Sequence, residues 1–284
     1  MAATKGVRTS VARTDARPIG VFDSGIGGLT VVSALRGLLP NERIFYLGDT
    51  ARVPYGGKSA ATVERYSLEI VAMLLEENCK TIVVACNTAS ALALPRLQQT
   101  LPITVTGVIL PGARAAVAAT RNGHIGVIGT RATIQSGAYE RALRSLNSEV
   151  RVTALPCPLL VPLIEEGWLQ NEITDRVIAR YLDPLVRVEI DTLVLGCTHY
   201  PLLRDAIARL LGDSVSLVDS AQNCASAVED LLIENELSAP AGSVGRLDVA
   251  LTDPPDNFLE VAREALQLEV GDIQLRQVLH PAKN

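Results

Sequence analysis

Residues 81–90 read TIVVACNTAS, an apolar, β-branched run that ends at Cys86 and then turns polar from Asn87 onward. A short, continuous apolar run of this kind is typical of a parallel strand that helices cover on both faces. Residues 192–199, TLVLGCTH, repeat the pattern and end on Cys197. Because ligands bind beyond the carboxyl ends of strands in open α/β sheets, both cysteines are candidate functional residues.

Runs of the same kind recur along the chain. We predict strands that begin near residues 19, 43, 81, 103, 125, 150, 192, 215 and 247. Amphipathic stretches with helical spacing fill most of the gaps, as in residues 61–78 and 171–190. This alternation predicts an α/β fold with mainly parallel sheets.

The predicted strands also form a weak internal repeat. Those near residues 19, 43, 81 and 103 are echoed, in the same order, by those near 125, 150, 192 and 215. We therefore predict two similar α/β domains related by a pseudo-twofold axis, with both cysteines facing one cleft between them. The expected copies are residues 18–111 and 112–220, and residues 221–284 must pack onto one of them.

Composition excludes several classes of function. The chain has 284 residues, of which 48% are hydrophobic and 4% aromatic, and its net charge is −5. Without a basic stripe or aromatic platforms, nucleic-acid binding is not expected. No apolar run reaches the roughly 18 residues of a membrane span. Residues 1–17 are polar, lack the apolar core of a signal peptide and are expected to be a disordered extension.

The cysteines and histidines argue against disulfides and metals. Five cysteines, an odd number, in a long chain without an export signal predict a reducing, cytoplasmic location. No pair has C-x-x-C spacing and the three histidines are scattered, so we expect no metal site. The cysteines assigned to packing are Cys79, Cys157 and Cys224.

Two glycine-rich stretches resemble nucleotide-binding loops but lack required residues. Residues 23–28, DSGIGG, follow the first strand, yet Thr30 stands where a dinucleotide fingerprint needs its third glycine. A glycine turn that opens a helix can still bind a carboxylate, and Asp23 could hold an ammonium or simply cap the helix. Residues 48–59 end in G-K-S, but Arg52 replaces the first glycine of a P-loop, so we reject an ATP site.

Three further groups could serve a site or have ordinary structural roles. Residues 129–139 present hydroxyls that fit a helix cap or a ligand, Thr133 among them. Glu165 and Glu166 follow an apolar segment, where one could buffer a proton or both could be solvated. His199 lies two residues after Cys197 and could tune that thiol.

Together these stretches resemble the cofactor-independent glutamate racemases. The resemblance runs from about Ile19 to Asp219 and rests on GVFDSGIGGLTV, YLGDTARVPYG, VVACNTAS, GTRATIQSGAY, PLLVPLIEEG and LVLGCTHYPLL. It implies two α/β domains with the active site between them and a C-terminal segment that returns to the first domain. It also implies a homodimer that supplies D-glutamate for bacterial peptidoglycan and needs no cofactor.

The resemblance also implies a role for each matching position. The two acid/base residues would be Cys86 and Cys197, supported by Asp23, Glu165 and His199. The substrate glutamate would be held by Asp23, Ser24, Tyr55, Gly56, Asn87, Thr88, Thr133 and Thr198.

Racemisation explains why two thiols would be needed. A proton leaves one face of the α-carbon and another arrives on the opposite face, so two catalysts work better than one. For equal work in both directions, their settings should be similar. Three alternatives stay open: a racemase for another amino acid such as aspartate, a hydrolase that uses Cys197 with His199, and a ligand-binding protein without catalysis.

Overall fold

The computed structural model describes residues 14–254, 262–263 and 266–278. Most of the expected disordered extension, residues 1–13, lies outside this range. Its last residues contact the body of the molecule: the Asp15 N–H donates to the Ser238 carbonyl at 2.9 Å, and Lys80 Nζ donates to the Asp15 carbonyl at 2.8 Å.

Six strands of the described chain form one fully parallel sheet, in the order β10-β9-β2-β1-β3-β4. Their bounds are β1 Ile19–Asp23, β2 Ile44–Gly48, β3 Thr81–Val84, β4 Val105–Gly107, β9 Leu247–Leu251 and β10 Ile273–Leu275. Both faces are buried, since Tyr46 packs in one apolar cluster and its neighbours Phe45 and Leu47 in another. In the central strands β1, β2 and β3 the apolar runs are continuous because every residue is buried.

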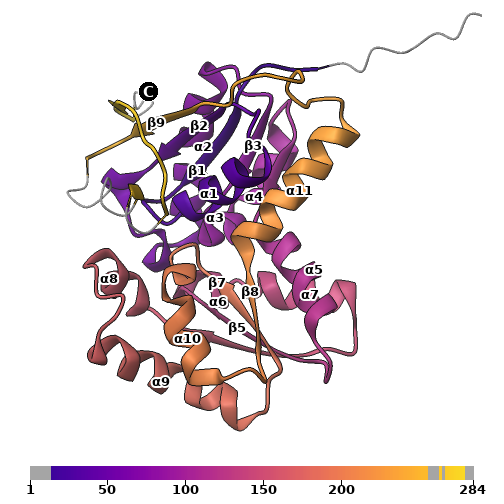
Figure 1. Cartoon of the computed structure of the whole chain (residues 1–284), viewed down its shortest axis with the longest axis vertical. Coiled ribbons are helices and arrows are strands. Elements are labelled where there is room, and N and C mark those ends of the chain that lie inside the picture. Colours follow the sequence, from indigo (N-terminus) through magenta and orange to yellow (C-terminus); the bar gives the residue numbers. More distant parts are fainter. Residues whose placement is uncertain (1–13, 255–261, 264–265, 279–284) are drawn as a thin grey trace, which may run out of the picture.

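A second parallel sheet has four strands in the order β6-β5-β7-β8. Its strands are β5 His124–Gly129, β6 Arg151–Pro156, β7 Thr192–Gly196 and β8 Ser216–Asp219. This order repeats β2-β1-β3-β4 of the first sheet strand for strand, as the internal repeat predicts. Figure 1 shows the first sheet in the upper half of the molecule and the second in the lower half.

The helices occupy the connections between strands. Before β5 they are α1 Leu29–Leu38, α2 Ala60–Glu76, α3 Asn87–Leu92, α4 Leu94–Thr100 and α5 Ile109–Ala119. After β5 they are α6 Arg131–Gln135, α7 Ala138–Leu146, α8 Leu160–Glu165, α9 Glu172–Arg187, α10 Arg204–Leu211 and α11 Ser220–Glu234. Short 3₁₀ helices cover Thr50–Arg52, Tyr55–Gly57 and Tyr200–Leu203.

Helix α11, orange in Figure 1, packs against α1 of the first unit and α5 of the second. It therefore joins the two halves and leads the chain back to the first sheet, where β9 pairs with β2. In the described part of the chain, no helix combines the length and the hydropathy that crossing a membrane requires.

Nine predicted strands are confirmed, and the structure adds a tenth, β10. This strand has three residues, of which Gln274 and Leu275 are exposed, so it carries no continuous apolar run. Strand β4 is also shorter than predicted and begins at Val105 instead of near residue 103. In both strands, pairing with a neighbour decides the bounds, which the local pattern does not contain.

Candidate active site

Cys86 lies where β3 ends and α3 begins, at the N-cap of the helix. Its sulfur accepts a hydrogen bond from the Ala89 N–H at 3.4 Å and donates to Ser24 Oγ at 3.7 Å. Burial raises the pKa of the Cys86 thiol, the charge of Asp23 raises it further, and the hydrogen bonds act in the opposite direction. The thiol is therefore protonated at rest, with helix N–H donors ready to stabilise a transient thiolate.

Cys197 follows β7 at the equivalent position of the second sheet and has a different neighbour. Its sulfur lies 3.8 Å from His199 Nδ1, and His199 Nε2 lies 3.2 Å from Glu165 Oε1. Burial alone would lower the pKa of His199, but hydrogen bonding to Cys197 and Glu165 raises the pKa to about 10. An imidazolium thus faces this sulfur at neutral pH.

The loop Asp23–Gly28 follows β1 and is built around the buried Asp23 carboxylate. Asp23 Oδ2 accepts from the Gly25 N–H at 3.2 Å and the Gly28 N–H at 2.9 Å, which holds the turn into α1. Asp23 Oδ1 is buried without a hydrogen-bond partner. One oxygen therefore has the capping role, while the other is free to meet a ligand.

This loop lies between the two cysteine motifs. On one side Ser24 accepts from Cys86. On the other, a Cβ built on Gly27 would come within 2.4 Å of His199 Nδ1, and Thr30 Oγ1 donates to the Thr198 carbonyl at 3.0 Å. Only a glycine allows this approach, so the absence of a side chain at residue 27 brings the second motif against the loop.

Three threonine hydroxyls form a cluster across the two halves. Thr88 Oγ1 lies 3.0 Å from Thr130 Oγ1 and 3.1 Å from Thr133 Oγ1, and the last two lie 2.9 Å apart. Thr130 also caps α6 by accepting from the Thr133 N–H. Both Thr130 and Thr133 therefore reach Thr88 of the first unit, and Thr130 caps the helix in addition.

Tyr55 and Gly56 belong to the loop after β2. The Tyr55 hydroxyl donates to Asp49, whose carboxylate also binds Arg52, so the phenol is already occupied. A Cβ on Gly56 would lie 2.6 Å from the Thr130 Cβ, which brings this loop against the second unit. Any contact of Tyr55 or Gly56 with a ligand would therefore use their backbone groups.

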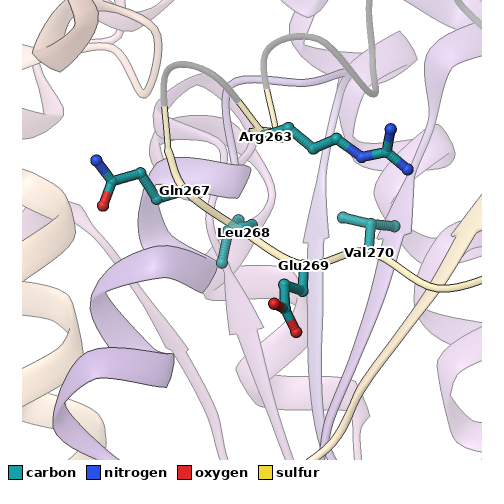
Figure 2. A pocket seen from close by; sticks show the side chains of 5 residues that line it. All are labelled: Arg263, Gln267, Leu268, Glu269 and Val270. Atoms are coloured by element: carbon teal, nitrogen blue, oxygen red, sulfur yellow. The ribbon is translucent and has the colours of Figure 1, made fainter.

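The remaining groups lie elsewhere. Glu166 follows α8 as its C-cap residue and is exposed, unlike Glu165, which lies against His199. Figure 2 shows a pocket that shares no residue with the cysteine motifs or their loops; it is lined by Arg263, Gln267, Leu268, Glu269 and Val270. Among the described residues, no three His, Cys, Asp or Glu side chains are grouped so that they could hold a metal ion.

Comparison with known proteins identifies the family. The model of the Asp/Glu/hydantoin racemase family matches residues 30–228, which is most of the chain. The chain belongs to the Asp/Glu/hydantoin racemase family. It is thus an isomerase, an amino-acid racemase, and its two α/β units are those of the family.

Close relatives of this racemase are known in sequence and in structure. The glutamate racemase of Geobacter metallireducens is 51% identical over 90% of this chain and 95% of that protein. That of Neisseria meningitidis serogroup A is 53% identical over 91% of this chain and 96% of its own length. The crystal structure of the Francisella tularensis glutamate racemase with D-glutamate has a TM-score of 0.87 at 39% identity, covering 93% of this chain and 98% of that one.

The sequence did not single out Tyr139, which the fold brings against Asn87 in the candidate site. Its hydroxyl donates to Asn87 Oδ1 at 2.7 Å, across the two units. Asn87 Nδ2 is buried and has no hydrogen-bond partner. A lone tyrosine on a helix face is usually a core residue, so the pattern carried no signal for this contact.

Proposed function

We propose that this racemase interconverts L- and D-glutamate by a two-base reaction of Cys86 and Cys197, without a cofactor. The observation that carries the proposal is that the loop Asp23–Gly28 contacts both cysteine motifs: Ser24 accepts from Cys86, and Gly27 lies against His199. A substrate held on this loop would present its α-carbon to one sulfur on each face. The relatives from Geobacter metallireducens and Neisseria meningitidis, which are 51% and 53% identical to this chain, are both glutamate racemases and support glutamate as the substrate.

In this scheme one cysteine is a thiolate and the other a thiol. For L-glutamate, the Cys197 thiolate removes the α-proton, the electron pair stays on the carbanion, and Cys86 delivers its proton to the opposite face. The reverse reaction exchanges the roles. The His199 imidazolium beside Cys197 supports this starting state, because a nearby positive charge stabilises a thiolate.

The unpaired buried atoms support the binding mode. Asp23 Oδ1 has no partner, and a substrate ammonium would compensate the cost of burying it. Asn87 Nδ2 is a free donor, suited to the α-carboxylate on which charge develops. The substrate contacts that we propose are those of Ser24, Tyr55, Gly56, Thr88, Thr133 and Thr198, in addition to Asp23 and Asn87.

We also propose the domain limits and the cellular setting. Residues 18–111 and 221–284 would form one domain and residues 112–220 the other, which the pairing of β9 with β2 supports. The enzyme would act as a homodimer in the cytoplasm and supply D-glutamate for peptidoglycan. Five free cysteines and relatives from bacteria support that setting. Sedimentation of the pure protein tests the dimer, and rescue of a D-glutamate-requiring bacterium tests the supply.

The decisive experiment is incubation of the purified protein with each glutamate enantiomer in heavy water without added cofactor. We expect deuterium at the α-carbon together with loss of optical activity. Folded protein that gives neither would refute the proposal and favour a binding protein. A parallel incubation with aspartate tests the nearest rival, since faster exchange with aspartate would reassign the substrate. The hydrolase rival predicts full activity without Cys86.

A further inference from the structure

Tyr139 contacts both cysteine motifs with one side chain. It is the second residue of α7 and is only 2% exposed. Its hydroxyl donates to the side chain of Asn87, the residue after Cys86. Its ring lies against Gly196, the residue before Cys197, where a Cβ would be 3.0 Å from ring atom Cε2. The side chain therefore spans the distance between the two motifs.

The hydroxyl determines which end of the Asn87 amide faces the site. An asparagine amide has one oxygen that accepts and one nitrogen that donates. Because Tyr139 donates to Oδ1 at 2.7 Å, Nδ2 is turned the other way, where it is buried without a partner. With the opposite orientation, an acceptor oxygen would face the carboxylate of the substrate and repel it.

The Tyr139 ring fixes the spacing between the two cysteine motifs, because neither Asn87 nor Gly196 can move closer to the other with the ring between them. An aromatic ring is rigid and has few rotamers, so it transmits a fixed length between its hydroxyl and its edge. Gly196 lets the ring approach the β7 backbone, and a Cβ there would also meet the Ile128 carbonyl at 2.7 Å. The hydrogen bond between Tyr139 and Asn87 joins the two units, since Asn87 belongs to α3 and Tyr139 to α7.

We propose that Tyr139 is a positioning residue of this racemase: its hydroxyl aims Asn87 Nδ2 at the substrate carboxylate, and its ring sets the separation of the two cysteine motifs. The inference rests on the proposed function, because it assigns Asn87 a carboxylate ligand. It explains why a buried amide keeps one donor unpaired, an arrangement that costs free energy unless a ligand completes it.

The test begins with Tyr139→Phe, which keeps the ring and removes the hydroxyl. We expect kcat/KM for glutamate to fall about tenfold, with the loss mainly in kcat, because the donor matters most as charge develops. In Tyr139→Leu, which also loses the ring, kcat/KM should fall further. Tyr181→Phe is the control for loss of a tyrosine hydroxyl: this hydroxyl accepts from the Leu159 N–H instead of contacting Asn87, and activity should be unchanged.

A double-mutant cycle shows whether Tyr139 acts through Asn87. In an Asn87→Ala background, Tyr139→Phe should cause no further fall in kcat/KM. Asn87→Asp preserves the shape but presents an acceptor to the substrate, and should lower kcat about a hundredfold. The Asn87→Asp variant keeps the inference testable even if thermal unfolding shows that the Tyr139→Phe variant is poorly folded.

Three results would overturn the inference. These are a Tyr139→Phe variant with wild-type kcat/KM, a full second loss in the Asn87→Ala background, or an Asn87→Asp variant of normal activity. Wild-type protein that exchanges no α-proton would instead overturn the proposed function, and the inference with it. Failure of the inference and failure of the proposed function are distinguishable, because only the heavy-water assay of the wild-type protein reports failure of the proposed function.

Discussion

Cys86 and Cys197 occupy equivalent positions in the repeat, but their neighbours differ. The sequence predicts similar settings, whereas Cys86 lies near a carboxylate, Asp23, and Cys197 near an imidazolium, His199. The repeat duplicates these segments but not these side chains: the end of β5 has Gly129 in place of Asp23, and Thr88 stands two residues after Cys86 where His199 follows Cys197. The two sulfurs therefore have different electrostatic surroundings, although the strands that carry them are equivalent.

At this scale we expect Cys86→Ser and Cys197→Ser each to lower racemisation by about a hundredfold to ten-thousandfold, because a serine hydroxyl is a far poorer proton carrier. Polarimetry with either enantiomer measures the loss. Cys224→Ala is the matched control. Cys224 is a buried cysteine that packs in a core cluster, so the variant enzyme should keep its racemase activity. A normal rate in either serine variant contradicts the two-base scheme.

The raised pKa of His199 predicts a pH dependence of stability. The unfolded chain loses the proton of His199 near pH 6.5, whereas the folded protein keeps it to about pH 10. This charge therefore stabilises the fold fully below about pH 6.5, and the contribution disappears as pH rises through 10. The difference in free energy of unfolding between wild type and His199→Gln should shrink over that window. A difference that stays constant with pH would speak against a charged His199.

Glu165→Gln gives a second check on the same ion pair. It removes one of the hydrogen-bond partners that raise the pKa of His199, so the pH window should end at a lower pH than in the wild type. Urea unfolding at several pH values measures both variants.

At the scale of elements, the loop Asp23–Gly28 is the part that connects the two halves of the site. It begins where β1 ends and leads into α1, and it contacts one cysteine motif through Ser24 and the other through Gly27. The glycine pattern left two interpretations open here, a ligand loop and a plain helix cap. The packing of Gly27 against His199 depends on an element that lies far along the chain, so no local pattern could predict it.

Gly27→Ala tests this contact. The added methyl would come within 2.4 Å of His199 Nδ1 and must displace the second motif, so we expect strongly reduced activity and a lower melting temperature. Gly37→Ala is the control, because no atom lies within 4 Å of a Cβ at that exposed position of α1. It should keep full activity and gain about 0.5–1 kcal/mol of stability from helix propensity. Equal activity and equal melting temperature of the Gly27→Ala and Gly37→Ala variants would contradict the close packing of Gly27 against His199.

At the scale of the whole molecule, a buried ion pair ties distant segments together. Lys80 Nζ lies 2.5 Å from Glu42 Oε2 and donates to the carbonyls of Asp15 and Leu237. Glu42 Oε1 accepts from the Ala239 N–H at 2.7 Å. The pair thus fastens both the N-terminal arm and the segment after α11 to the first sheet.

Lys80→Met should therefore lower the free energy of unfolding by about 3–5 kcal/mol, because it leaves the Glu42 carboxylate buried without its cation. Lys80→Met combined with Glu42→Gln should cost less than the single change. Arg176→Ala removes a pair whose side chains are both mostly exposed, and should have little effect. Urea denaturation compares the three variants, and a larger loss in the double variant would contradict the reasoning.

The sequence by itself determined the α/β class, the places of nine strands along the chain, the repeat and the position of each cysteine at the end of a strand. These follow from continuous apolar runs and from residues that end a strand, which are local properties. Only the tertiary structure decided the rest: β10 at the sheet edge, the occupied hydroxyl of Tyr55, and the contact of Tyr139 with Asn87. Each depends on a partner that the chain folding brings near, and a hydrogen bond between two units leaves no trace in the pattern of either one.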